Sequence, residues 1–381
     1  MRKDLIIEDT TLRDGEQAPG VAFDKEAKIR VYELLVKAGV KWLEVGIPAM
    51  GGEELETIKV LREKGIEDGV TTVAWNRGIK EDVRQSLDLG FTSIHIGLPT
   101  SNIHLKNSIN KDKKWLVQQA TDLVKFAKDR GAFVSISAED VGRTDINFLQ
   151  EYTVHVTEAG ADRLRLSDTV GILSPEKYAH IIQSVKKVSA IDLQSHAHND
   201  YGLATANTLE AIKSGVRYFH VTVNGIGERA GMADLSQMAL LLQHMYNLDL
   251  GIDLSMLTDL AEAVSFYTRT PLYPWQPVVG KNVFSHESGI HANGTIKCGG
   301  AFEPFAPSLV GGKRKIVIGK HSGKHALKYV LEEAGIHKVN ETLLSYCLHE
   351  VRALSIASGT CLSSSQLVAI YTNLTEHIRE A

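Results

Sequence analysis

Two histidines separated by one residue, His196 and His198, are the strongest chemical signal in the sequence. Residues two apart on a β-strand point to the same side, so both imidazoles can face one space. With a carboxylate such as Asp14 they would form a site of two histidines and one carboxylate, with coordination positions left open for a substrate. The alternative is that one of the two histidines is a packed or surface residue. The surrounding pattern favours metal binding.

Arg13 directly precedes Asp14 and has two interpretations. It is either half of an ion pair on a loop, or a fixed guanidinium that polarises a carbonyl and holds developing negative charge. Other polar residues also lie within or after strand-like segments. These are Glu44, Glu139, Asp140, Asp168 and Thr169. A folded barrel needs none of this charge for its stability, so its concentration indicates a site.

Eight short apolar segments alternate with helix-length stretches over the first two thirds of the chain. The predicted strands are 5–9, 42–46, 70–75, 93–97, 133–137, 163–167, 192–196 and 218–222. Strict alternation predicts a parallel sheet, and eight units over about 250 residues favour a (β/α)8 TIM barrel over an open sheet. Since active sites of such barrels lie at the carboxyl ends of the strands, the polar residues named above are expected to meet there.

The character of the chain changes beyond the eighth unit. We predict a catalytic barrel over 1–250, a linker marked by prolines over 251–279, and C-terminal subdomains over 280–381. Helical patterns at 324–334, 340–358 and 364–378 predict a small, mostly helical C-terminal region.

The bulk composition is that of a globular protein and argues against several classes of partner. The 381 residues carry a formal net charge of −4 and a pI near 6.4, so neither nucleic acid nor an anionic membrane is expected as a partner. No segment reaches the roughly 18 apolar residues of a membrane span, and the N-terminus has no signal-like region. A cytoplasmic protein is expected. The three cysteines have no CxxC spacing, and no dinucleotide-binding GxGxxG follows the first strand.

Five segments together resemble one enzyme family. They are 9–17 (DTTLRDGEQ), 196–200 (HAHND), 224–229 (NGIGER), 286–291 (HESGIH) and 319–323 (GKHSG). In this order they resemble the homocitrate synthase and isopropylmalate synthase family, whose members condense acetyl-CoA with 2-oxo acids. Lyases and aldolases of the wider superfamily share the barrel segments but lack the last two, so an acyltransferase is expected. The overall pattern is most similar to the short homocitrate synthases associated with nitrogen fixation.

The resemblance implies a divalent cation, Mg²⁺, Mn²⁺ or Zn²⁺, held by Asp14, His196 and His198 with the acceptor's carboxylate and ketone oxygens. It also implies that Arg13 stabilises the alkoxide formed as the ketone is attacked. The other implied contacts of the acceptor are Gln17, Glu44 and Thr169.

The resemblance further implies that His291 removes a proton from the methyl group of acetyl-CoA, with Glu139 aligned to assist or orient it. Because His291 lies outside the barrel segments, it is expected to act at the site of a neighbouring subunit, in a homodimer. Hydrolysis of the thioester then releases CoA and makes turnover effectively irreversible.

Four positions depart from the family pattern. Phe302 stands where many relatives have a tyrosine and cannot donate a hydrogen bond, and Met232 stands where many have an asparagine. Trp75 and Ser135 stand where lysine-pathway homocitrate synthases use a histidine and an arginine to bind the distal carboxylate of 2-oxoglutarate. Such a carboxylate would need another donor here. Candidates are Arg77, Arg143 and Arg165.

The expected acceptor is 2-oxoglutarate, which would give (R)-homocitrate. Alternatives with the same chemistry are oxaloacetate, as in a Re-type citrate synthase, 2-oxoisovalerate and pyruvate. Two alternatives belong to other classes: a retro-Claisen lyase or aldolase, and a non-catalytic metabolite sensor. The presence of Arg13 and His291 beside the metal ligands argues against a sensor, because a binding protein has no need of a base.

Overall fold

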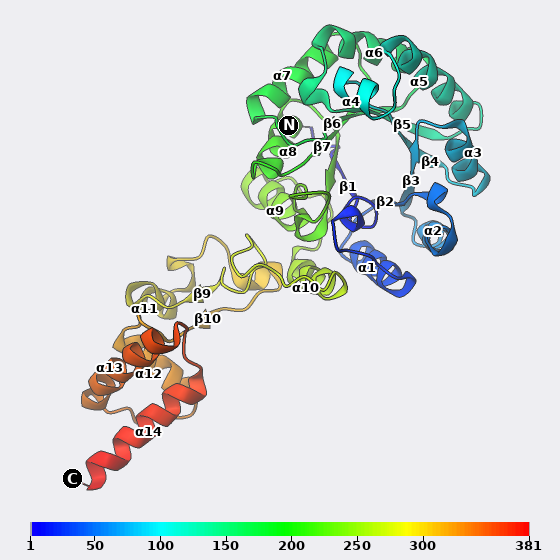
Figure 1. The fold of residues 1–381 in the computed structure, drawn as a ribbon. Coiled ribbons are helices and arrows are strands. Elements are labelled where there is room, and N and C mark those ends of the chain that lie inside the picture. The colour runs from blue at the N-terminus through cyan, green and yellow to red at the C-terminus, as the bar shows by residue number, and fades with distance from the viewer. Residues whose placement is uncertain (1, 381) are drawn as a thin grey trace. The chain divides into compact units, whose positions relative to one another are not determined.

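The computed structural model describes residues 2–380, and the chain divides into two compact units, Met1–Leu272 and Tyr273–Ala381. In the first unit, eight parallel strands pair in sequence order and close into a barrel, since β8 pairs with β1. Figure 1 shows the strands as an inner ring and the helices that follow them as an outer ring. The predicted TIM barrel is confirmed.

Each predicted strand overlaps an observed one. The strands are β1 Ile6–Asp9, β2 Trp42–Gly46, β3 Thr71–Arg77, β4 Ser93–Gly97, β5 Phe133–Glu139, β6 Arg163–Asp168, β7 Asp192–Ala197 and β8 Tyr218–Val221. The helices of this unit are α1 Lys25–Lys37, α2 Gly52–Glu67, α3 Lys80–Asp88, α4 Asn102–Asn107, α5 Lys113–Lys128, α6 Ile146–Glu158, α7 Pro175–Lys186, α8 Ala204–Lys213, α9 Leu235–Leu240 and α10 Leu257–Tyr267.

Short polar side chains fix where many of these helices begin. The side chain that precedes the first helical residue accepts a hydrogen bond from the backbone N–H three residues later, which satisfies a donor that the helix itself leaves unpaired. This capping residue is Asp24 for α1, Asp112 for α5, Asp145 for α6, Ser174 for α7 and Asp234 for α9. The helices therefore start at defined points after the loops that carry the site.

The floor of the barrel is aromatic. Trp42, Phe133 and Tyr218 are the first residues of their strands, and the Trp42 ring lies 5.4 Å from each of the other two rings. The buried guanidinium of Arg163 lies 4.6 Å from the centre of the Tyr218 ring, in a cation–π contact. Barrel interiors are usually filled with branched apolar side chains. Here charged side chains lie above an aromatic floor, so the interior is built to hold polar groups in place.

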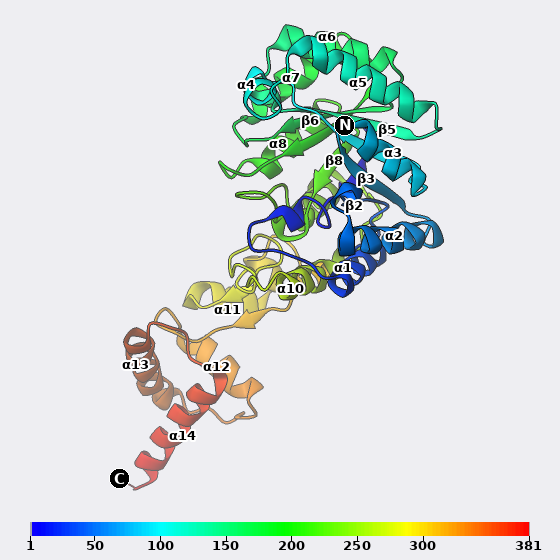
Figure 2. The same cartoon turned by 45° about the vertical axis from the view of Figure 1, so that its right-hand side comes forward.

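The second unit is described by itself. Strands β9 Ser285–His286 and β10 Lys315–Ile316 pair in parallel, and the helices are α11 Gly289–Lys297, α12 Lys324–Glu333, α13 Glu341–Ser358 and α14 Ser364–Glu380. Helices α12, α13 and α14 pack on one another (Figure 2), and their shared core includes Leu327, Leu344 and Leu367. The three helical patterns of the sequence therefore correspond to observed helices, whereas α11 was not predicted. Within residues 2–380, no helix is both long and apolar enough to cross a membrane.

Candidate active site

Asp14, His196 and His198 meet at the carboxyl ends of β1 and β7. His196 Nε2 lies 3.1 Å from His198 Nε2 and 3.5 Å from Asp14 Oδ2, and all three side chains are buried. One ligand atom from each lies within 4.8 Å of the others. Asp14 Oδ1 is buried without a hydrogen-bond partner, which is unusual for a buried polar atom. A cation among these three side chains would satisfy it, so the residues fit a metal ion.

The second nitrogen of each histidine is also engaged. His198 Nδ1 lies 3.2 Å from the carbonyl oxygen of Gly231, which can only accept, so Nδ1 carries the proton and Nε2 keeps its lone pair. His196 Nδ1 lies 2.9 Å from Nδ1 of His220. The pKa of His196 is held well below its usual range, mainly by burial and then by the neighbouring His198 and His220. Neutral imidazoles of this kind are suited to metal coordination.

Arg13 is held in one orientation above the barrel interior. Its Nη1 donates to Asp14 Oδ2 at 2.8 Å and to Gln17 Oε1 at 3.2 Å, while its Nε donates to Glu44. Burial would raise the pKa of Glu44, but Arg13 and Arg165 outweigh it and lower that pKa to about 2. The Arg13 guanidinium is therefore a fixed positive charge directly beside the candidate metal ligands.

Glu8, Glu44 and His220 form a second group whose ligand atoms are close enough to hold a metal. The carboxylate oxygens of Glu8 and Glu44, however, already accept hydrogen bonds from guanidinium groups. Arg163 Nη1 donates to Glu8 at 2.6 Å, and Arg165 Nη2 donates to Glu44 at 2.6 Å and to Glu8 at 3.2 Å. We interpret this group as a buried ion-pair network and not as a metal centre, because two carboxylates that face guanidinium groups have no need of a cation.

A cavity of about 190 Å³ opens beside the metal ligands. Thr169 lines it, with its Oγ1 accepting from the backbone N–H of Asp140 at 2.8 Å. His95 on β4 also lines it and is fully buried, with Nδ1 2.9 Å from Ser135 Oγ and Nε2 without any hydrogen-bond partner. Two further residues of this lining are Arg165 and Arg229. The cavity has the size of a small organic acid, and its lining includes several donors as well as the carboxylates of Asp14, Glu139 and Glu228.

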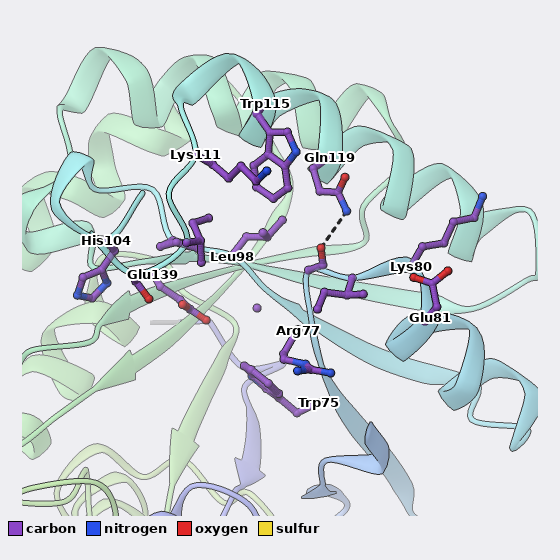
Figure 3. A pocket seen from close by; sticks show the side chains of 16 residues that line it. Trp75, Arg77, Lys80, Glu81, Leu98, His104, Lys111, Trp115, Gln119 and Glu139 are labelled. Atoms are coloured by element: carbon purple, nitrogen blue, oxygen red, sulfur yellow. Dashed lines mark hydrogen bonds between the residues drawn. The ribbon is translucent and has the colours of Figure 1, made fainter. Parts of the chain in front are cut away.

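A larger cavity of about 630 Å³ lies beside the first, and Trp75 and Glu139 line both. Figure 3 shows Trp75 of β3 and Trp115 of α5 on opposite sides of it. A Cβ atom at Gly97 would lie 2.5 Å from the Trp75 ring and 2.8 Å from Glu139, so only glycine fits at this junction. Burial raises the pKa of Glu139, although Ser137, Arg13 and Arg165 act in the opposite direction.

The structure brings most of the predicted site residues together. Arg13, Gln17, Glu139 and Thr169 line the small cavity beside the three candidate metal ligands, whereas Glu44 is fully buried and reaches the site through Arg13. His291 lies in α11 of the second unit, where its ring stacks on Phe302 with centroids 4.2 Å apart.

The three candidate arginines for a distal carboxylate have different surroundings. Arg165 lines the small cavity. Arg77 lines the larger cavity and is paired with Asp82 at 2.7 Å, and Arg143 is paired with Asp140 at 2.8 Å.

Three functional candidates were not singled out from the sequence: His95, Glu8 and His220. His95 and His220 lie between apolar residues of their strands, whereas Glu8 lies between Ile7 and Asp9. A polar residue at the centre of a buried parallel strand is the signal that could have found them, because such strands normally read as continuous apolar runs.

Two family models match the chain. A model described as HMGL-like matches residues 4–264, and one described as homocitrate synthase post-HMGL domain-like matches residues 278–358. The hydroxymethylglutaryl-CoA lyase structure from Pseudomonas aeruginosa superposes with a TM-score of 0.63 at 19% identity, over 71% of this chain and 95% of that one. That likeness concerns the fold alone.

Curated relatives match over nearly the whole chain. A 2-phosphonomethylmalate synthase from Streptomyces rubellomurinus is 58% identical over 97% of this chain and 99% of its own. The 2-isopropylmalate synthase 2 of Caldanaerobacter subterraneus is 43% identical over 98% and 96%. Homocitrate synthase 1 of Nostoc is 39% identical over 96% of both chains.

Proposed function

Because this chain belongs to the HMGL-like family, among synthases that condense acetyl-CoA with 2-oxo acids, we propose that its acceptor is a short 2-oxo acid with a second anionic group. The observation that carries this proposal is the small cavity beside Asp14, His196 and His198, whose lining includes the guanidinium groups of Arg13 and Arg165. These three residues would hold the divalent cation, for which Mg²⁺, Mn²⁺ and Zn²⁺ all suit the ligand set. When bound, the cation supplies Lewis acidity toward the ketone oxygen.

The charges around the small cavity favour a dianionic acceptor. Three guanidinium groups and three carboxylates line the small cavity, so the formal charges of its lining cancel. They are Arg13, Arg165 and Arg229 against Asp14, Glu139 and Glu228. A divalent cation adds two positive charges, which a dianion neutralises, whereas a monoanionic acid such as pyruvate leaves one buried charge without a partner.

His95 and Arg165 are the proposed donors to the second anionic group. Ser135 Oγ accepts from Arg163 Nε at 3.0 Å, so its own proton is free to go to His95 Nδ1. That arrangement leaves the His95 proton on Nε2, at the wall of the cavity. A phosphonate or a carboxylate would accept it. The 58% identity to a 2-phosphonomethylmalate synthase favours 3-phosphonopyruvate first and 2-oxoglutarate, the acceptor of homocitrate synthases, second.

The larger cavity suits acetyl-CoA. Its wall is largely apolar, with Trp75 and Trp115 able to stack on a base or pack against pantetheine, and Arg77 and Lys111 supply positive charge for phosphates (Figure 3). Glu139 lines both cavities, so it would face the thioester methyl group on one side and the ketone on the other.

The condensation then proceeds with the residues in defined roles. Glu139, or His291 aligned by it, takes a proton from the methyl group, and the resulting carbon forms a bond to the ketone carbon. Arg13 stabilises the negative charge on the former ketone oxygen, which takes up a proton to become a tertiary alcohol. Water then breaks the thioester C–S bond and gives a carboxylate and CoA. Glu44 acts as a positioning residue for Arg13.

We also propose a homodimer in which His291 serves the site of the partner subunit. Mixing Asp14→Asn chains with His291→Ala chains tests it. Recovery of up to a quarter of wild-type activity in randomly paired dimers is expected, because only mixed dimers hold one intact site. No recovery in dimers shown to be mixed would contradict the shared site.

The experiment that tests the function is CoA release from acetyl-CoA with Mg²⁺ or Mn²⁺ present. The acceptors are 3-phosphonopyruvate, 2-oxoglutarate, oxaloacetate, 2-oxoisovalerate and pyruvate. We expect kcat/KM to be highest for a dianionic acceptor. A preference for 2-oxoisovalerate or pyruvate would contradict the charge argument but keep the chemistry. No release with any acceptor, together with cleavage of a hydroxyacyl-CoA, would instead indicate a lyase.

The role of His95 makes a separate prediction. His95→Phe keeps the volume but removes the donor, and a lost hydrogen bond to a charged group costs about 1.5–3 kcal/mol. The KM of the preferred dianionic acceptor should rise about 10- to 100-fold, with the KM of acetyl-CoA unchanged. His180→Phe on the exposed face of α7 serves as control. An equal rise in KM for 2-oxoisovalerate would indicate a general packing defect and not a lost contact.

A further inference from the structure

A chain of buried polar groups continues beneath the candidate metal ligand His196. His196 Nδ1 lies 2.9 Å from His220 Nδ1, and His220 Nε2 lies 2.9 Å from Glu8 Oε1. Glu8 and His220 are register partners of β1 and β8, and both are fully buried. The barrel itself therefore fixes the link between the carboxylate and the second histidine.

Glu8 is held as a carboxylate. Arg163 donates to both of its oxygens, at 2.6 and 3.3 Å, and Arg165 donates at 3.2 Å. Burial would raise the pKa of Glu8, but Arg163, His220 and Arg165 together hold it well below its usual range. An ionised carboxylate only accepts, so the group facing it must donate.

This requirement sets the proton positions along the whole chain. His220 must carry its proton on Nε2, toward Glu8, which leaves a lone pair on its Nδ1. His196 must then donate from Nδ1 to His220, which leaves the lone pair of His196 Nε2 directed at Asp14 and His198. With the opposite tautomers, the His196 proton would point at the cation position, and two lone pairs would oppose each other between His220 and Glu8.

We propose that His220 and Glu8 are positioning residues, which fix the tautomer and orientation of His196 and strengthen it as a ligand for the divalent cation. The inference rests on the metal-dependent function proposed above. Outer partners of this kind typically change metal affinity about 10- to 100-fold when they are lost. The same network reaches Arg13 through Arg165 and Glu44, so one set of buried charges orients both the metal ligand and the electrophile.

The test separates the two hydrogen bonds of His220. In His220→Asn, the amide oxygen takes the place of Nδ1 and can still accept from His196. In His220→Gln, the amide nitrogen takes the place of Nε2 and can donate to Glu8, but His196 loses its acceptor. His220→Phe removes both bonds. Ser195→Ala is the matched control on β7, since Ser195 is buried and its Oγ has no hydrogen-bond partner.

Mn²⁺ affinity of the full chain is measured by calorimetric titration, with circular dichroism to check folding. We expect the Asn variant to stay within a few fold of wild type and the Gln and Phe variants to bind about 10- to 100-fold more weakly. A purely structural role would lower the melting temperature of Asn and Gln variants alike without separating their Mn²⁺ affinities. If the Phe variant does not fold, the Asn and Gln pair still decides.

Two results would overturn the inference, and only the second would also overturn the proposed function. Wild-type Mn²⁺ affinity in a folded Gln variant would remove the role of His220 and leave the proposed function standing. If the wild-type chain binds none of Mn²⁺, Mg²⁺ and Zn²⁺, the metal site is removed, and with it both the proposed function and this inference.

Discussion

Replacing Asp14 by asparagine is expected to lower kcat/KM by about 10³-fold while the barrel stays folded. Asp14 provides the only carboxylate of the candidate metal group, and its Oδ1 is buried without a partner. Removing its charge weakens cation binding, and Lewis-acid stabilisation is worth several kcal/mol, at about 1.4 kcal/mol for each tenfold in rate. The change keeps the size of the side chain, so the circular dichroism spectrum should not move.

The measurements are CoA release under saturating Mn²⁺ and metal content after dialysis. Asp122→Asn, on the exposed side of α5, is the control for the same chemical change. Full activity with a bound metal in the Asp14 variant would remove Asp14 from the ligand set. Partial recovery of activity at high Mn²⁺ concentration would support the assignment, because it would show that the variant binds the cation more weakly.

The barrel was predictable because each of its strands and helices has a pattern that is visible in a short stretch of sequence. Each strand is a short apolar run followed by a helix, and only a few architectures accommodate eight such units. The gathering of Arg13, Asp14, His196 and His198 follows from that architecture, since the carboxyl ends of all strands meet on one face. Thr169 and Glu139 reach the same rim for the same reason.

The charged interior was not predictable from local patterns. Arg163 and Arg165 alternate with leucines on β6, which resembles a strand with one face in solvent. Their partner Glu8 is 155 and 157 residues away in sequence, so nothing near β6 indicates that the polar face is buried. The same reasoning applies to Glu44, which was expected to contact the acceptor but is covered by Arg13 and Arg165. Pairings of this range become visible only when the barrel is closed.

The boundary between the two cavities likewise depends on the closed barrel. In the sequence, Trp75 is a departure from a family pattern that has a histidine in its place. In the structure it lines both cavities and lies 5.8 Å beneath the Arg13 guanidinium. A bulky ring at this point limits the size of the acceptor cavity. The boundary is formed by Trp75 and Glu139, which belong to separate strands.

Glu139→Gln is expected to lower kcat by about 10²- to 10⁴-fold, the usual contribution of a general base. Glutamine keeps the shape of the side chain at the junction of the two cavities, so KM for the acceptor and Mn²⁺ affinity should change little. Glu151→Gln on the exposed side of α6 is the control. A Glu139 variant with wild-type kcat would move the role of base to His291 alone.

The pH profile distinguishes a base from a residue that only shapes the cavity. A base acts when deprotonated, so the rate of the wild-type enzyme falls as the pH drops through the pKa of Glu139. Burial raises that pKa, so the acid limb should lie above the usual range of a glutamate. The residual rate of Glu139→Gln should lack this limb, since glutamine does not titrate. An unchanged acid limb in the variant would show that another group governs it. Glu139 would then be left with a positioning role toward the substrate.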